Sequence, residues 1–133
     1  MPKFFKILFF LIFSANAQSQ NFSLSFDGSN DYVSIADHNE LDFIDNYTLE
    51  AWVKAESFSW LGGIISKYQT NAANGFTLRL TDVTPYDGVG FDGKYTSLSQ
   101  LNLEQWYHIA AVKDGVSRKM YINGIEVQLY GSA

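Results

Sequence analysis

The feature that most constrains the fold is the stretch of residues 106–130, which reads WYHIAAVKDGVSRKMYINGIEVQLY. Two dipeptides, Asp114-Gly115 and Asn123-Gly124, divide it into three short apolar runs. Asp-Gly and Asn-Gly supply the positive-φ residues that tight hairpin turns require, so the flanking runs should pair as antiparallel strands. The stretch therefore predicts a three-stranded meander.

The first and last strands of this meander differ in pattern. In the last one, apolar and polar residues alternate over residues 125–129, which predicts one buried face and one wet face. In the first, apolar residues fall on both faces, which predicts cover on both sides and a core position for Trp106. Together these patterns indicate a two-layer, all-β core.

The rest of the chain after residue 21 contains short strand-like runs and no helical periodicity. A first hairpin is predicted where residues 22–26 and 32–35 flank the turn-forming residues 27–31. A central strand at residues 47–55 would bury Trp52. Short strands without intervening helices favour a sandwich or jelly roll over a βαβ fold. Further strands are expected at residues 64–67, 76–80 and 89–91.

The N-terminus predicts a secretory signal peptide. Lys3 and Lys6 precede an apolar run at residues 7–13, and Ala15-Asn16-Ala17 supplies small residues at signal-peptidase spacing, with cleavage expected after Ala17. The run is far shorter than the roughly 20 residues that span a bilayer as a helix. We therefore expect a secreted protein, extracellular or at the cell surface, with no membrane span in the mature chain.

Charge and cysteine content narrow the possible partners. Cleavage would remove Lys3 and Lys6, so nine basic residues against fourteen acidic ones become seven against fourteen, and the net charge falls from −5 to −7. This balance argues against nucleic acid, whose binding needs clustered Lys and Arg. The chain has no cysteine, so the core of a single domain at residues 18–133 must suffice without disulfides.

Four runs in the same order resemble the concanavalin A-like jelly roll and, more narrowly, the laminin G-like modules of secreted bacterial proteins. They are LSFDGSNDYVSI (24–35), YTLEAWVKA (47–55), GFTLRL (75–80) and WYHIAAVKDGVSRKMYINGIEV (106–127). The resemblance implies a two-sheet antiparallel jelly-roll sandwich. It also implies an extracellular module that binds glycans or proteins, or that accompanies a catalytic domain.

The end of the sequence departs from this family pattern. Laminin G-like modules usually continue past the meander to a closing strand of the type Gly-x-Ile-Asp-Glu-Val-Arg-Ile-Tyr, which pairs beside the first strand. Here the sequence stops at Gly131-Ser132-Ala133. Either the sequence is part of a longer product or something else completes the module, and we favour the longer product because native proteins protect the edges of their sheets.

Acidic residues predict calcium as a candidate cofactor. Residues 27–45 contain six Asp or Glu and no Lys or Arg. Calcium takes several carboxylate and carbonyl oxygens, and many laminin G-like modules bind it. The spacing is not that of an Asp-x-Asp-x-Asp-Gly loop, however, and solvated turns favour the same residue types. The expected ligands are Asp27 and Asp31.

Little in the sequence predicts catalysis. A glycoside hydrolase needs two carboxylates across a cleft, and the Glu-x-Asp-x-x-Glu motif of laminarinase-like enzymes of this fold is not present. Glu50 and Glu104 stand alone and are interpreted as structural or solvated. The chain has two widely separated His, no Cys and no Gly-x-Ser-x-Gly motif. The sequence therefore offers no recognisable pair of nucleophile and base for nucleophilic catalysis.

Aromatic residues in predicted loops favour binding instead. Sugars stack their C–H faces on aromatic rings while polar side chains bond their hydroxyls. We therefore predict a non-catalytic module for polysaccharide or glycoprotein. The alternatives are a hydrolase or lyase whose catalytic groups lie outside this chain, and a purely structural repeat, in which these aromatics only cap the core. The candidate ligand-binding residues are Trp60, Tyr68, Tyr86 and Tyr95.

Overall fold

The computed structural model divides between Ile35 and Ala36 into two parts, which are described separately. The predicted signal peptide lies outside the described residues, and so do Trp60 and Tyr68. The structure describes residues 22–58, 62–67, 75–83, 86–97 and 100–131.

The first part, residues 22–35, contains no strand among its described residues, so the predicted first hairpin is wrong. Its apolar side chains are exposed, with Phe22 at 89% and Tyr32 at 81%. An isolated two-stranded hairpin is marginally stable in water, because it has no second layer against which to bury its apolar face. The local alternation of apolar and polar residues predicted strands here, but alternation alone is not sufficient to form a sheet.

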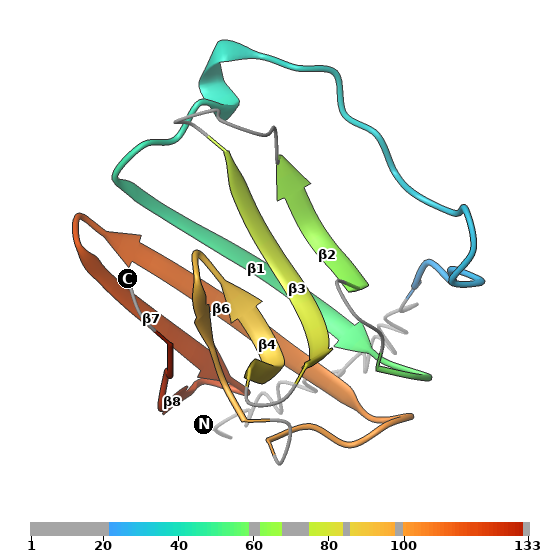
Figure 1. The fold of residues 1–133 in the computed structure, drawn as a ribbon. Coiled ribbons are helices and arrows are strands. Elements are labelled where there is room, and N and C mark those ends of the chain that lie inside the picture. The colour runs from blue at the N-terminus through green and yellow to red at the C-terminus, as the bar shows by residue number, and fades with distance from the viewer. Residues whose placement is uncertain (1–21, 59–61, 68–74, 84–85, 98–99, 132–133) are drawn as a thin grey trace, which may run out of the picture. The chain divides into compact units, whose positions relative to one another are not determined.

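The second part is an antiparallel β-sandwich (Figure 1). One four-stranded sheet has the order β1-β6-β7-β8 and the other β2-β3-β4-β5, which confirms the predicted all-β, two-sheet architecture. A short 3₁₀ helix at Asn39–Leu41 was not predicted. The strands are β1 Asn46–Lys54, β2 Gly62–Lys67, β3 Phe76–Val83, β4 Tyr86–Phe91, β5 Lys94–Tyr95, β6 Trp106–Asp114, β7 Ser117–Ile122 and β8 Ile125–Val127.

Strands β6, β7 and β8 form the predicted meander. Gly115 has φ 56° and opens the two-residue turn Gly115-Val116, because Asp114 ends β6 and pairs with Ser117. Asn123 and Gly124, with φ 52° and 78°, form the other turn as predicted. The Asn123 side chain also accepts a hydrogen bond from the His108 backbone N–H, 2.9 Å away. The last strand is shorter than predicted, and Ile125 is 71% exposed rather than buried.

The core lies between the two sheets and draws on both. Leu49 from β1 and Ile109 and Ala111 from β6 face Leu78 of β3 and Phe91 of β4 in one buried cluster. These residues occupy alternate positions on their strands, as the period of two requires for a half-buried sheet. The inner faces are thus apolar, and the outer faces remain for other roles.

The predicted core positions of Trp52 and Trp106 are wrong, because these residues are 66% and 45% exposed. Register pairs Trp52 with His108. Since side chains alternate along a strand, Trp52 shares the outer face of β1 with Glu50, while Leu49 points into the core. The same alternation on β6 sends Tyr107 inward and Trp106 outward.

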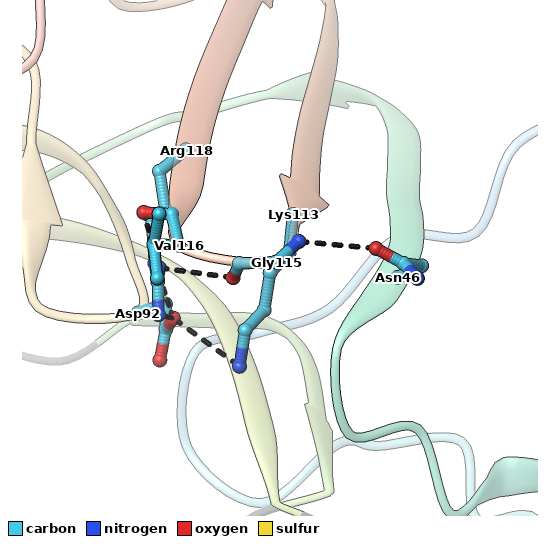
Figure 2. A network of polar contacts seen from close by, with 6 residues as sticks. All are labelled: Asn46, Asp92, Lys113, Gly115, Val116 and Arg118. Carbon is cyan, nitrogen blue, oxygen red and sulfur yellow. Dashed lines mark hydrogen bonds and ion pairs between the residues drawn. The ribbon is translucent and has the colours of Figure 1, made fainter.

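A polar network joins the two sheets at one end of the sandwich (Figure 2). Arg118 donates from Nε to Asp92 Oδ2 over 2.7 Å, and its Nη2 lies 2.6 Å from the same oxygen. Its Nη1 donates to the carbonyls of Val116 and Gly115, at 2.6 and 3.2 Å. Lys113 Nζ lies 3.8 Å from Asp92 Oδ2. Asp92 follows β4 and Arg118 lies on β7, so this half-buried ion pair ties one sheet to the other.

A second ion pair holds the 3₁₀ segment against the end of β2. Lys67 Nζ lies 2.9 Å from Asp37 Oδ1 and also contacts the Asp42 carboxylate. The hydrogen bond and charge of Lys67 lower the pKa of Asp37 below its ordinary value of 3.8. Conversely, hydrogen bonds to Asp37 and Asp42 raise the pKa of Lys67 above 10.5.

The Lys67 contact should make stability depend on pH with a defined sign. It contributes fully between 3.8 and 10.5, and it is lost as pH falls through the folded-state pKa of Asp37 or rises through that of Lys67. We therefore expect the melting temperature of Lys67→Met to fall less steeply than that of the wild type between about pH 5 and pH 2. If the melting temperature falls equally with pH in both proteins over this range, the proposed contribution of the Lys67 contact is contradicted.

Because Trp52 is exposed, we expect its replacement by a small residue to change the stability of the protein only slightly. We expect Trp52→Ala to lower the free energy of unfolding by less than about 1 kcal/mol, because a surface substitution leaves no cavity. Ile109→Ala, at a position with 0% exposure, should cost about 2 to 5 kcal/mol. Urea unfolding measures both, and equal losses would show that the tryptophan is buried.

Candidate functional site

A groove of about 520 Å³ lies on the sheet formed by β2, β3, β4 and β5. On β3, Phe76 and Leu78 are buried in the core, whereas Thr77 and Arg79 are half-exposed and point away from it. The groove therefore occupies the outer face of this sheet. The residues that supply its polar and aromatic groups are Ser66, Thr77, Arg79, Asp92 and Tyr95.

Strand register places a row of four residues across this face. Gly63 of β2 pairs with Arg79 of β3, Arg79 with Gly90 of β4, and Gly90 with Tyr95 of β5. Two glycines thus alternate with two large side chains. A Cβ at position 90 would lie 3.0 Å from the Tyr95 ring and 3.2 Å from Arg79 Cγ, so the glycine lets both side chains lie close to the sheet. A Cβ at position 63 would meet nothing within 4 Å, which leaves that side of the row open.

Arg79 and Tyr95 fix each other. Arg79 Nη2 donates to the Tyr95 hydroxyl over 2.8 Å, and the guanidinium carbon lies 5.6 Å from the centre of the ring. The Tyr95 backbone is fixed independently, because its N–H and carbonyl both bond to Tyr130, at 3.0 and 2.8 Å. Lys94 Nζ adds a bond of 2.7 Å to the Gly131 carbonyl. The binding groups therefore start from a defined geometry.

The turn before Tyr95 shapes the rim of the groove. Asp92 and Gly93 have φ 47° and 75°, the left-handed conformations of a tight hairpin turn between β4 and β5. Figure 2 shows the Asp92 carboxylate directed at Arg118 and Lys113. Arg118 consequently positions the turn that carries Tyr95, and it neutralises the one carboxylate among the described lining residues.

Of the four predicted ligand-binding aromatics, the structure places one in the groove. That residue is Tyr95. Tyr86 opens β4 opposite Val83, and its side chain lies outside the described part, as do Trp60 and Tyr68 entirely. Sequence reasoning missed Arg79. Its position between Leu78 and Leu80 was a usable signal, because alternation puts a residue flanked by core-facing leucines on the opposite face.

The outer face of the other sheet carries an aromatic surface that the sequence interpretation assigned to the core. The rings of Trp52 and His108 lie 5.4 Å apart, and Trp106 is two residues from His108 on the same side of β6. Glu50 lies 3.6 Å from His108 Nε2, and Lys54 bonds Glu104 over 3.0 Å. The groove over β2 to β5 has a defined volume and a lining of polar side chains, so we take it as the candidate site.

The expected calcium ligands are engaged in the turn that contains them. Asp31 Oδ2 accepts the Asp27 backbone N–H at 3.0 Å, and Asp27 Oδ1 accepts that of Ser29 at 2.8 Å. These bonds are typical of Asp in a solvated turn. In the described part of the chain, no group of three or more His, Cys, Asp or Glu side chains gathers to hold a metal. Calcium binding by Asp27 and Asp31 stays a prediction.

The family assignment agrees with this architecture. The family model of the concanavalin A-like lectin/glucanases superfamily matches residues 27–131, and the chain belongs to that superfamily. No significant match was found among curated proteins or among solved structures. In the described residues, no helix has the length and apolar character needed to cross a membrane.

Calcium can be tested by thermal unfolding. A ligand that binds only the folded state stabilises it by mass action, so calcium in excess should raise the melting temperature relative to a chelator if Asp27 and Asp31 bind it. The double variant Asp27→Asn/Asp31→Asn should then show no such difference. Identical melting curves of the wild type in calcium and in chelator would remove the prediction.

Proposed function

We propose that the protein is a secreted, non-catalytic module that binds polysaccharide or the glycan of a glycoprotein in the groove over β2 to β5. Membership of a lectin-like superfamily supports a carbohydrate-binding or related module in general. The observation that carries the specific proposal is the hydrogen-bonded Arg79 and Tyr95 pair, laid across a row whose other members are glycines.

This arrangement offers what a sugar ring needs. A pyranose has an apolar C–H face that packs against an aromatic ring, and hydroxyls that require hydrogen-bond partners. Tyr95 supplies the ring, while Arg79, Thr77 and Ser66 supply donors and acceptors in the same groove. Because Arg79 and Tyr95 are already bonded to each other, little side-chain freedom remains to be lost when a ligand binds.

The alternative of a hydrolase or lyase makes different demands. Glycoside hydrolysis uses two carboxyl groups that flank the scissile bond. Among the described lining residues the carboxylate is Asp92, and it is ion-paired with Arg118. Glu50 lies on the outer face of the other sheet, and Glu104 is bonded to Lys54. A catalytic function would thus depend on groups outside the described groove.

Affinity electrophoresis in gels that contain a panel of polysaccharides tests the proposal. We expect retardation by at least one of them, with no release of reducing sugar. Gly63→Trp should abolish retardation, because its bulky ring system covers the groove, which a small side chain at this open position does not, and its Cβ meets no neighbour. Tyr95→Ala should weaken binding at least tenfold, or about 1.4 kcal/mol, through loss of the stacking ring.

Trp52→Ala is the matched control, since it removes an exposed aromatic residue from the opposite sheet. Binding that survives in both groove variants and disappears in Trp52→Ala would place the ligand on the β1 and β6 face instead. Reducing sugar released by the wild type would favour the catalytic alternative.

A further inference from the structure

Arg79 has a different kind of hydrogen-bonding partner from the other basic residues of the described chain. Five of them lie within ion-pair distance of a carboxylate: Lys54, Lys67, Lys113, Arg118 and Lys119. Lys94 donates to the carbonyl of Gly131. Arg79 alone among the described cations reaches into the groove, and there it bonds a neutral phenol. Its charge is not matched by any described carboxylate.

The charge of the groove follows from this pairing. Arg79 and Asp92 are the charged residues among its described lining. The Asp92 carboxylate is compensated by Arg118 at 2.6 Å and Lys113 at 3.8 Å. The guanidinium of Arg79 therefore determines the local potential of the groove, even though the chain as a whole carries a net charge of −5. Acidic residues farther than about 8 Å away are largely screened at physiological ionic strength.

A neutral sugar would leave this cation poorly matched. Covering a guanidinium with a ligand removes water from it, and that loss is repaid only when the ligand supplies a counter-charge with good hydrogen-bond geometry. A guanidinium carries five N–H donors arranged to meet a planar carboxylate or a sulfate in pairs. The bond to Tyr95 uses one edge of the Arg79 guanidinium and leaves donors for an anion.

We infer that the groove selects an anionic sugar, one bearing a carboxylate or a sulfate group, with Arg79 pairing the anion while Tyr95 stacks on the ring. This inference rests on the proposed function, because it names the class of glycan that the same groove binds. The chemistry shared by uronic acids and sulfated sugars is a delocalised oxyanion next to an apolar ring face.

The strand register provides a direct test. Gly63 lies opposite Arg79 on the neighbouring strand, and a side chain added there meets open space. Gly63→Asp should place a carboxylate beside the guanidinium and neutralise it, because directly opposed residues of paired strands have Cβ atoms only about 5 Å apart. Gly63→Asn adds nearly the same volume without charge and is the matched control.

Each protein is titrated calorimetrically with oligogalacturonate and with its carboxyl-reduced, neutral counterpart, and with dextran sulfate and dextran. The wild type should bind one of the acidic probes at least tenfold more tightly than its neutral counterpart, and the pair that shows the difference identifies carboxylate or sulfate. Gly63→Asp and Arg79→Gln should both lose this preference, while Gly63→Asn keeps it. Lys54→Gln, which removes a cation from the other sheet, should leave it unchanged.

The outcomes separate this inference from the proposed function. Equal or tighter binding of the neutral probes by the wild type would overturn the anionic preference and leave a glycan-binding groove. Preservation of the preference in Gly63→Asp, or an equal loss in Lys54→Gln, would also overturn it, because the charge of Arg79 would not be its source. Failure of the wild type to bind any of these probes, or any glycan in the wider panel, would remove both proposals.

Discussion

Burial of the inner face of β6 against the opposite sheet is the interaction on which the rest of the structure depends. Tyr107, Ile109 and Ala111 lie on this face, and β6 pairs with β1 on one side and β7 on the other. A fully buried side chain of the size of Ile109 contributes about 1.5 to 3 kcal/mol, a large share of a total stability of about 5 to 15 kcal/mol. Because the inner faces form the core, they are closed to a ligand, and the groove of β2 to β5 is a hollow on one of the outer faces.

The contact between Asp92 and Arg118 connects this packing to the candidate site. It joins the turn after β4 to β7 of the other sheet, and the same turn leads within three residues to Tyr95. One ion pair thus positions the turn that leads to Tyr95 and compensates the negative charge of Asp92 in the groove. Burial and the nearby Asp92 raise the pKa of Tyr47, whose ring also lies 5.7 Å from Lys113 Nζ, so this end of the sandwich combines aromatic packing with compensated charges. Against that compensated background, Arg79 is the charge that a ligand would meet.

Much of the fold could be predicted from the sequence because its signals are local. Asp114-Gly115 and Asn123-Gly124 mark the two hairpin turns, and the three strands beside them pair as predicted, although the last one is shorter. The predictions failed where local pattern was not enough. Residues 22–26 and 32–35 alternate like strands, yet alternation alone does not form a strand, and neither segment is a strand in the structure. Trp52 and Trp106 were assigned to the core because they lie inside predicted strands, although alternation puts them on the face of Glu50 and His108.

The sequence by itself determined the class of fold and the turns of the meander, because these follow from backbone preferences and the two-residue period of β-structure. It did not determine which face of each strand is buried, since Trp52 and Trp106 were assigned to the core and are exposed. It also identified Tyr95 as a candidate without indicating what would stand beside it. Only the tertiary structure decided that Gly63, Arg79, Gly90 and Tyr95 form one row, because these residues come from four strands and meet through register between segments that are distant in the chain. The charge of the groove also depends on the tertiary structure, because the Asp92 carboxylate is compensated by Arg118, which approaches it from the opposite sheet.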